Sequence, residues 1–250
     1  MVKVAILVSG QCRTLNICLP SIQRQILAQF PMADLWVSVA DGPDSEQASL
    51  FANVGLKVRL LEKVTQPTLD ERDYRQKSAG GEYWIGTGPH DRTIVQRILR
   101  QAWHLRRVYE WAAHSGEDYD VYVRLRPDQW FFVGAQGLPE ITPKKAVVPW
   151  WGSFGGVNDR FAILGRQAAE AYCWWPQLDR WLGEGCRFHP ETLTKYALMR
   201  NGCKIVLSAV SAATLKMGAD GIVQVRHPEV LPEEMMPLPG GVPMVAAVDA

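Results

Sequence analysis

The order of strand-like and helical segments at the start of the chain constrains its fold more than any other feature. Val2–Val8 is an apolar, β-rich run, and runs of similar character follow at Asp34–Ala40 and Leu56–Leu61. A helical stretch from about Pro20 to Phe30 separates the first two runs, and a shorter one separates the next two. This alternation predicts a parallel α/β sheet with right-handed crossovers. An apolar run is typical of a strand at the centre of such a sheet.

The remaining segments extend this pattern to about residue 226. Residues 92–114 repeat apolar side chains every three or four positions, which predicts a long amphipathic helix. Pro190–Arg200 has a proline just inside its start and Gly202 just past its end, the asymmetry favoured at helix termini. Further strands are predicted at 119–126, 130–133, 146–151, 160–164, 204–207 and 222–225, and further helices at 166–175 and 177–183. We predict a single domain over residues 1–226, with a mixed, mainly parallel sheet flanked by helices, and an extended or partly disordered tail over 227–250.

Composition excludes several classes of function. The formal net charge of +1 provides no strong field for nucleic acid or an anionic membrane surface, so any phosphate recognition must be local. The five cysteines are odd in number and lack the paired short spacing of zinc sites, which fits reduced thiols. The first apolar run is too short for a signal sequence or a membrane span. We therefore expect a cytoplasmic protein that binds no nucleic acid and spans no membrane.

The run Tyr119–Asp128 carries the most chemical information. Apolar residues alternate along it as in a strand, and Pro127 cannot donate to a strand ladder, so pairing should stop there. Arg124, Arg126 and Asp128 then lie at the carboxyl end of the strand, where open α/β sheets bind ligands. Two cations and an acid suit a doubly negative phosphate, with or without a divalent metal ion between them. The alternative is a buried Arg–Asp pair with a structural role.

A turn with ligand-binding character follows the first strand. Gly10 would let the backbone approach a ligand closely, and Arg13 could bind a phosphate through two hydrogen bonds. Ser9 opens the same turn. The segment is neither a P-loop nor a G-x-G-x-x-G motif, and an ordinary strand-to-helix turn explains it equally well.

Two acidic motifs bear on metal binding. Asp118-Tyr119-Asp120 is a literal Asp-x-Asp, but it precedes its strand, so we predict a solvated turn at the sheet edge opposite the ligand. Arg126-Pro127-Asp128 stands where an acidic metal motif would be useful. With one carboxylate instead of two, it predicts modest metal affinity.

Two later segments carry candidate catalytic acids. In Gly155–Phe161 the glycines permit close backbone approach, and Asn158 and Asp159 carry acceptors suited to sugar hydroxyls, although a plain β-turn has the same composition. Glu191 opens the helix after Pro190. It either complements the helix dipole or points into a cleft as a general base.

Residues 62–90 show no clear periodicity and mix charges, glycines and aromatic residues. Long irregular segments in a compact domain are often functional. We predict a mobile flap over the substrate here.

Taken in order, these segments resemble a family of glycosyltransferase-like proteins with a GT-A-type nucleotide-sugar fold, found among bacterial, viral and plant sequences. Each motif alone has low specificity, and their order and spacing over most of residues 1–210 carry the resemblance. The matching pieces are Ser9-Gly10 with Arg13-Thr14, Tyr119–Asp128, Asn158–Ala162 with Tyr172, and Pro190–Leu193 with Tyr196 and Asn201-Gly202.

The resemblance implies an enzyme that moves a sugar from a nucleotide-sugar donor to a glycan or other hydroxyl acceptor. Asp128 would stand where the family places the acid that binds Mn²⁺ or Mg²⁺, although the departure from a full Asp-x-Asp leaves metal dependence open. Asp159 and Glu191 would face the sugar and the acceptor, and one of them would act as the general base. The donor-binding residues that the resemblance implies are Ser9, Gly10, Arg13, Arg124, Arg126, Asp128 and Asn158.

Two other functions fit the same residues. A sugar-nucleotide nucleotidyltransferase could use a similar sheet, although the opening turn lacks the Gly-x-Gly-x-Arg pattern of that class. A carbohydrate-binding protein without turnover could use some of the ten tryptophans, whose flat faces suit sugar rings.

Overall fold

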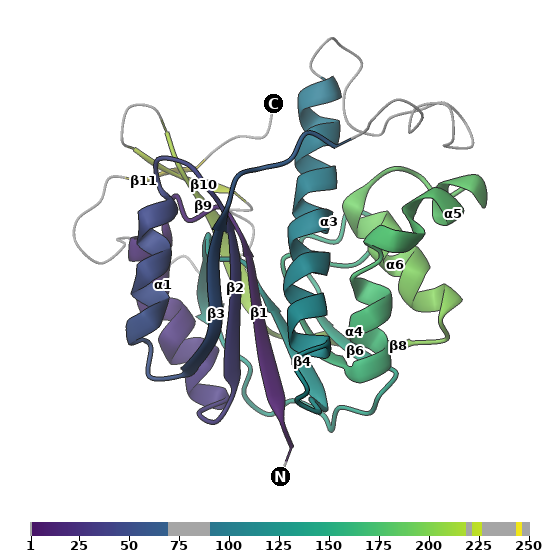
Figure 1. Ribbon diagram of the computed structural model, residues 1–250, viewed down its shortest axis with the longest axis horizontal. Coiled ribbons are helices and arrows are strands. Elements are labelled where there is room, and N and C mark those ends of the chain that lie inside the picture. Colours follow the sequence, from purple (N-terminus) through teal and green to yellow (C-terminus); the bar gives the residue numbers. More distant parts are fainter. Residues whose placement is uncertain (1, 70–90, 219–221, 227–243, 247–250) are drawn as a thin grey trace.

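The computed structural model describes residues 2–69, 91–218, 222–226 and 244–246, and it places a large sheet between two layers of helices (Figure 1). Within these residues the large sheet has seven strands in the order β3-β2-β1-β4-β7-β6-β8. All of them run parallel except β7, which is antiparallel to both of its neighbours. The strands are β1 (Val4–Gly10), β2 (Asp34–Ala40), β3 (Lys57–Val64), β4 (Val121–Leu125), β6 (Lys145–Pro149), β7 (Phe161–Gly165) and β8 (Lys204–Ser208). The predicted mixed, mainly parallel sheet is confirmed.

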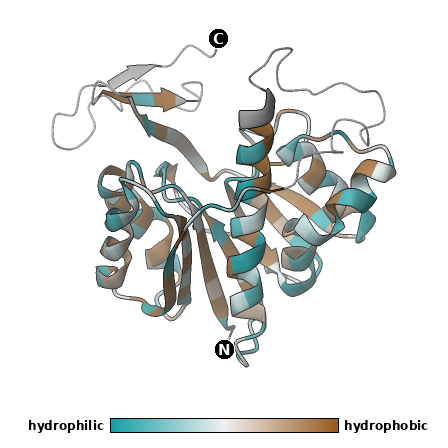
Figure 2. Ribbon diagram, turned by 45° about the horizontal axis from the view of Figure 1, so that its top comes forward, coloured by the Kyte–Doolittle hydropathy of each residue, from teal (hydrophilic) through white to brown (hydrophobic). Residues whose placement is uncertain are grey.

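The alternation of side chains along β1 explains why helices cover both faces. Ile6 and Val8 point into a core shared with α1 (Leu15–Gln25) and η2 (Ser45–Asn53). Ala5 and Leu7 point into a second core, shared with α3 (Asp91–Ala113) and α4 (Arg166–Tyr172). Figure 2 shows strands that are mostly hydrophobic, whereas α3 alternates between hydrophilic and hydrophobic residues. The other helical segments are η1 (Leu27–Gln29), η3 (Trp175–Gln177), α5 (Leu178–Gly183) and α6 (Pro190–Arg200).

Helix α1 differs from its prediction. It was expected from about Pro20 to Phe30, but it spans Leu15–Gln25 and contains Pro20 in its interior. Proline in a helix interior removes a backbone hydrogen bond. Here the helix buries Leu15, Cys18 and Ile22 completely, and the burial of these residues outweighs the penalty.

A second sheet was not predicted. Its four strands, in the order β11-β10-β9-β5, are β5 (Gln129–Val133), β9 (Ser211–Met217), β10 (Val223–Arg226) and β11 (Met244–Ala246). The chain leaves the large sheet at Pro127 and enters β5 of the smaller one. Met244–Ala246 belong to the predicted tail and pair with β10, whereas 227–243 and 247–250 lie outside the described residues. Across the described segments, no helix combines the length and hydrophobicity that a membrane crossing needs.

The strand order locates the expected ligand site. From β1 the chain builds β2 and β3 on one side and later adds β4 on the other, so the topological switch point lies between β1 and β4. Ligands of open α/β sheets bind beyond the carboxyl ends of the strands at such a point. After β3, residues 65–69 run along α3, where Gln96 hydrogen-bonds to the backbone of Leu69. Residues 70–90 of the predicted flap lie outside the described residues.

Candidate functional site

A cavity of about 240 Å³ opens beyond the carboxyl ends of β1 and β4. We call it the arginine-lined cavity, because five of the eleven described residues that line it are arginines and none is acidic. The turn after β1, the end of β4 and one face of α3 form its walls. The lining residues are Ser9, Gly10, Gln11, Arg13, Gln66, Arg97, Arg100, Gln101, His104, Arg124 and Arg126.

The cavity brings together Ser9, Gly10, Arg13, Arg124 and Arg126, which sequence reasoning assigned to the donor site. The turn after β1 lies close to the turn after β4, because a Cβ atom on Gly10 would lie 3.2 Å from Pro127 Cδ. With a φ of +140°, Gly10 also adopts a backbone conformation that other residues rarely adopt.

Sequence reasoning missed the contribution of α3. Arg97, Arg100, Gln101 and His104 follow a spacing of i, i+3, i+4 and i+7, so they share one face of the helix. This spacing is the signal that could have found them. The polar and charged residues of this face are also typical of a helix face in contact with solvent, and nothing in the local sequence indicates that the face borders a cavity.

Arg124 is the most unusual residue of the cavity. Its side chain is fully buried, and its Nη1 donates hydrogen bonds to the carbonyl oxygens of Ser9 (3.0 Å) and Leu125 (2.7 Å). Among the described residues, its Nε and Nη2 have no hydrogen-bond partner, and no acid lies within ion-pair distance, although the negative charge of Asp159 acts on Arg124 from farther away. Burial lowers the pKa of Arg124 to about 10, and the positive charge of Arg126 adds to this effect. A buried guanidinium without an ion-pair partner is strongly destabilising.

Arg126 and Asp128 form the buried pair that sequence reasoning held as an alternative to phosphate binding. Arg126 Nε donates to Asp128 Oδ1 (2.9 Å) and Nη2 donates to Oδ2 (2.6 Å). Burial alone would raise the pKa of Asp128, but the charge and hydrogen bonds of Arg126 outweigh burial and lower it. Arg126 still lines the cavity, where its Nη1 donates to Gln101 Oε1 (3.3 Å).

The residues present do not fit the divalent metal ion that the family resemblance implies. Both carboxylate oxygens of Asp128 accept hydrogen bonds from Arg126, and its side chain is only 1% exposed. In the described part of the chain, no group of three or more His, Cys, Asp or Glu residues could hold a metal ion. The Asp-x-Asp motif lies at the opposite edge of the sheet, as predicted, where Asp118 is 86% exposed and pairs with Arg166.

Next to the cavity lies a pair of buried acids, Asp159 and Glu191, which we call the carboxylate pair. Asp159 belongs to the loop that enters β7, and Glu191 lies in the first turn of α6. Arg160 lies between them, with Nη1 3.5 Å from Asp159 Oδ1 and Nη2 3.4 Å from Glu191 Oε1. Burial raises the pKa of Glu191, and the negative charge of Asp159 raises it further. One cation between two buried acids therefore favours a proton on Glu191.

His189 orients Glu191. Burial lowers the pKa of His189, so its ring is neutral near pH 7. Its Nδ1 lies 3.0 Å from Thr192 Oγ1 and its Nε2 lies 3.2 Å from Glu191 Oε2. We assign the tautomer from these contacts, with the Thr192 hydroxyl donating to Nδ1 and the Nε2 proton pointing at Glu191.

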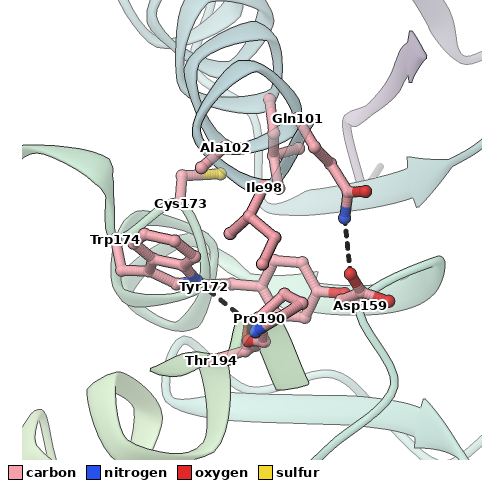
Figure 3. A pocket seen from close by; sticks show the side chains of 10 residues that line it. Ile98, Gln101, Ala102, Asp159, Tyr172, Cys173, Trp174, Pro190 and Thr194 are labelled. Atoms are coloured by element: carbon pink, nitrogen blue, oxygen red, sulfur yellow. Dashed lines mark hydrogen bonds between the residues drawn. The ribbon is translucent and has the colours of Figure 1, made fainter. Parts of the chain in front are cut away.

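Gln101 joins the arginine-lined cavity to the carboxylate pair. Its Oε1 accepts from Arg126, and its Nε2 donates to Asp159 Oδ2. Figure 3 shows this side chain reaching from α3 to Asp159, above Tyr172. The pocket drawn there holds about 10 Å³, which is room for a single water molecule. A displacement of Arg126 or of Asp159 therefore acts on the other residue through the side-chain amide of Gln101.

Asn158 holds together the loop that enters β7. Its Nδ2 donates to the carbonyl of Trp151 (2.8 Å), and its Oδ1 accepts from the backbone amides of Arg160 (2.8 Å) and Phe161 (3.0 Å). The observed contacts position Asp159 and Arg160.

The loop is also packed tightly against α6, and this packing supports a stability prediction. A Cβ atom on Gly156 would lie 2.0 Å from the carbonyl oxygen of Glu191. Gly156→Ala should therefore separate the loop from α6 and lower the free energy of unfolding by about 1–3 kcal/mol. Gly183→Ala is the control, because a Cβ on Gly183 meets nothing within 4 Å. Urea unfolding of both variants measures the difference, and equal midpoints would argue against this packing.

Compared with models of protein families and with curated proteins, the chain gives no match, so the resemblance drawn from its motifs remains a prediction.

Proposed function

We propose that this protein transfers a sugar from a nucleotide-sugar donor to a hydroxyl acceptor. One observation carries the proposal: a cavity with five arginines and no described acid lies next to a buried carboxylate pair, and Gln101 contacts both. Sugar transfer needs positive charge where the phosphate leaves and a proton acceptor where the hydroxyl attacks. The two halves of the site would supply these two requirements.

The arginine-lined cavity would bind the nucleoside diphosphate. When the bond between the sugar carbon and the phosphate oxygen breaks, that oxygen gains negative charge. Arg13, Arg124 and Arg126 would donate hydrogen bonds to the diphosphate, and preorganised donors of this kind contribute several kcal/mol to lowering a barrier. The turn at Gly10 would bring backbone close to the phosphates.

The carboxylate pair would accept the proton of the attacking hydroxyl. Glu191 is the better candidate for the base, since its raised pKa lies closer to neutrality than that of an ordinary carboxylate. Asp159 would raise the basicity of Glu191 through its negative charge. Its hydrogen bond from Gln101 would connect the carboxylate pair to the arginine-lined cavity.

An exposed aromatic residue beside the pair suggests where the acceptor binds. Phe154 is 45% exposed and has a positive φ of 39°, and its ring centroid lies 5.6 Å from the Arg160 guanidinium and 6.4 Å from the His189 ring. Aromatic faces pack well against sugar rings. Backbone strain at a non-glycine residue is often retained at functional positions.

We expect Phe154→Ala to raise the KM for a glycan acceptor by about 3- to 10-fold, as the loss of one aromatic contact implies. Hydrolysis of the donor without acceptor should not change, because Phe154 does not line the arginine-lined cavity. Met199→Ala, at an exposed position on α6, is the matched control. Steady-state kinetics with varied acceptor would test this, and an unchanged KM would place the acceptor elsewhere.

A release assay tests the function itself. The purified protein is incubated with single UDP- and GDP-sugars, and free nucleoside diphosphate is measured over time. Slow release that stops in Glu191→Gln would support a transferase. Chemistry that depends on pyrophosphate would instead indicate a nucleotidyltransferase, and glycan binding without nucleotide affinity would indicate a binding protein.

A further inference from the structure

We propose that the arginine-lined cavity binds the diphosphate of its ligand without a divalent metal ion, and that Arg124 and His104 supply two of the contacts. The inference rests on the proposed function for the identity of the natural ligand. The binding of a bare diphosphate does not depend on turnover, so it can be tested separately.

The charges around the cavity disfavour a metal ion. Mg²⁺ and Mn²⁺ prefer oxygen ligands, above all carboxylates, and no described lining residue carries a carboxylate. Three acids interact electrostatically with Arg126, and each already has a polar partner. Glu191 lies near Arg160 and His189. Asp128 is bound through both oxygens, and Asp159 is held by Gln101 and Arg160. A divalent cation would enter the field of five guanidinium groups, whereas a diphosphate would neutralise that field.

Arg124 is preorganised for an anion. The hydrogen bonds from its Nη1 to two backbone carbonyls fix the guanidinium plane, while Nε and Nη2 keep unused protons. Nε and Nη2 lie on one edge of a guanidinium, which is the geometry that binds two phosphate oxygens at once. Because the side chain is already out of water, the ligand does not have to desolvate it.

His104 offers a second unused contact. It is 2% exposed, its Nδ1 lies 3.0 Å from Ser38 Oγ, and its Nε2 has no partner among the described residues. Burial and the charges of Arg107, Arg124 and Arg100 lower its pKa to about 4, so the ring is neutral near pH 7. If the Ser38 hydroxyl donates to Nδ1, the Nε2 proton can be donated to a phosphate oxygen.

The test measures binding of inorganic pyrophosphate by calorimetry at pH 7.5, once with EDTA and once with Mn²⁺. We expect binding in EDTA to be at least as tight as in Mn²⁺, because Mn²⁺ complexes free pyrophosphate in solution and adds no contact in the cavity. Arg124→Met should weaken binding by about 10- to 100-fold, and His104→Leu by about 3- to 10-fold, as the loss of charged and neutral hydrogen bonds implies. Arg180→Met is the matched control, because Arg180 is exposed on α5 and does not line the cavity.

Each result decides the inference. Binding that requires Mn²⁺, no binding in either buffer, or equal affinity of the wild type and the Arg124→Met protein would overturn it. If Arg124→Met does not fold, Arg13→Met, at a partly exposed position, takes its place with the same expectation. Pyrophosphate binding in EDTA without hydrolysis of any sugar nucleotide would leave this inference standing and reject the proposed function. Turnover that requires Mn²⁺ would support the function and reject the inference.

Discussion

Arg124→Met is expected to make the ligand-free protein more stable by about 1–2 kcal/mol while removing most of its affinity for a diphosphate. The guanidinium is fully buried and forms no ion pair with a described residue, and burial lowers its pKa to about 10 from 12.5 despite the opposing charge of Asp159. A shift of that size corresponds to roughly 3 kcal/mol against the charged form. The lost hydrogen bonds to Ser9 and Leu125 offset this gain by about 1 kcal/mol each.

Urea unfolding with and without pyrophosphate measures both effects. The wild type should gain stability when the ligand is added, and the variant should not. Arg180→Met should change stability by less than about 0.5 kcal/mol, as most surface substitutions do. If Arg124→Met were less stable than the wild type without ligand, the guanidinium would be serving the fold and not a ligand.

Glu191→Gln is expected to lower the rate of sugar transfer by about 10²- to 10⁴-fold, the usual contribution of a general base. The base must be ionised to act, and burial together with Asp159 raises the pKa of Glu191. The wild-type rate should therefore rise with pH through that raised pKa.

The variant Asp159→Asn tells which of the two acids is the general base. If Glu191 is the base, this variant stays active and its pH profile moves to lower pH, since one cause of the raised pKa is gone. A complete loss of activity in Asp159→Asn would make Asp159 the base.

The substitution Glu191→Gln should also change how the free energy of unfolding depends on pH. Because the pKa of Glu191 is higher in the folded state than its ordinary value of 4.5, the folded protein binds this proton more tightly than the unfolded chain does. The stabilisation is full below the unfolded pKa and is lost as pH rises through the folded pKa. Glu191→Gln cannot ionise, so its stability relative to the wild type should increase from pH 5 to pH 9. Glu170→Gln, at an exposed position on α4, is the matched control.

The parts of the fold that follow from local patterns were predicted well. The bounds of β2 and α6 agree with the sequence prediction, and those of α3 agree to within one residue. Their periodicity is strong and their ends carry clear signals. Strand β9 was missed, because Ser211–Met217 is rich in small residues and becomes a strand by pairing with β5, some eighty residues earlier in the chain. Long-range pairing of this kind leaves little trace in local composition.

The residues of the candidate site likewise divide into those that the sequence could group together and those that it could not. Residues that follow strands could be grouped from sequence, because parallel strands end at one edge of a sheet, and Ser9 and Arg126 do line one cavity. Arg97 and His104 could not, since their helix face has the composition of a solvated one. The sequence also suggested a buried Arg–Asp pair as an alternative to phosphate binding, but only the side-chain geometry shows that Arg126 occupies both oxygens of Asp128.

The single reversed strand β7 has a consequence for how such a site could diversify. Because β7 runs against its neighbours, the residues that precede it, Asp159 among them, arrive at the same rim as the residues that follow β1 and β4. The arginine-lined cavity is thus built from residues that follow β1 and β4, whereas Asp159 of the carboxylate pair comes from the loop that precedes β7. Lengthening or shortening the stretch before Phe161 would change the proposed acceptor side without changing the strand ends that border the arginine-lined cavity. The two segments meet at Gln101, which contacts both Arg126 and Asp159.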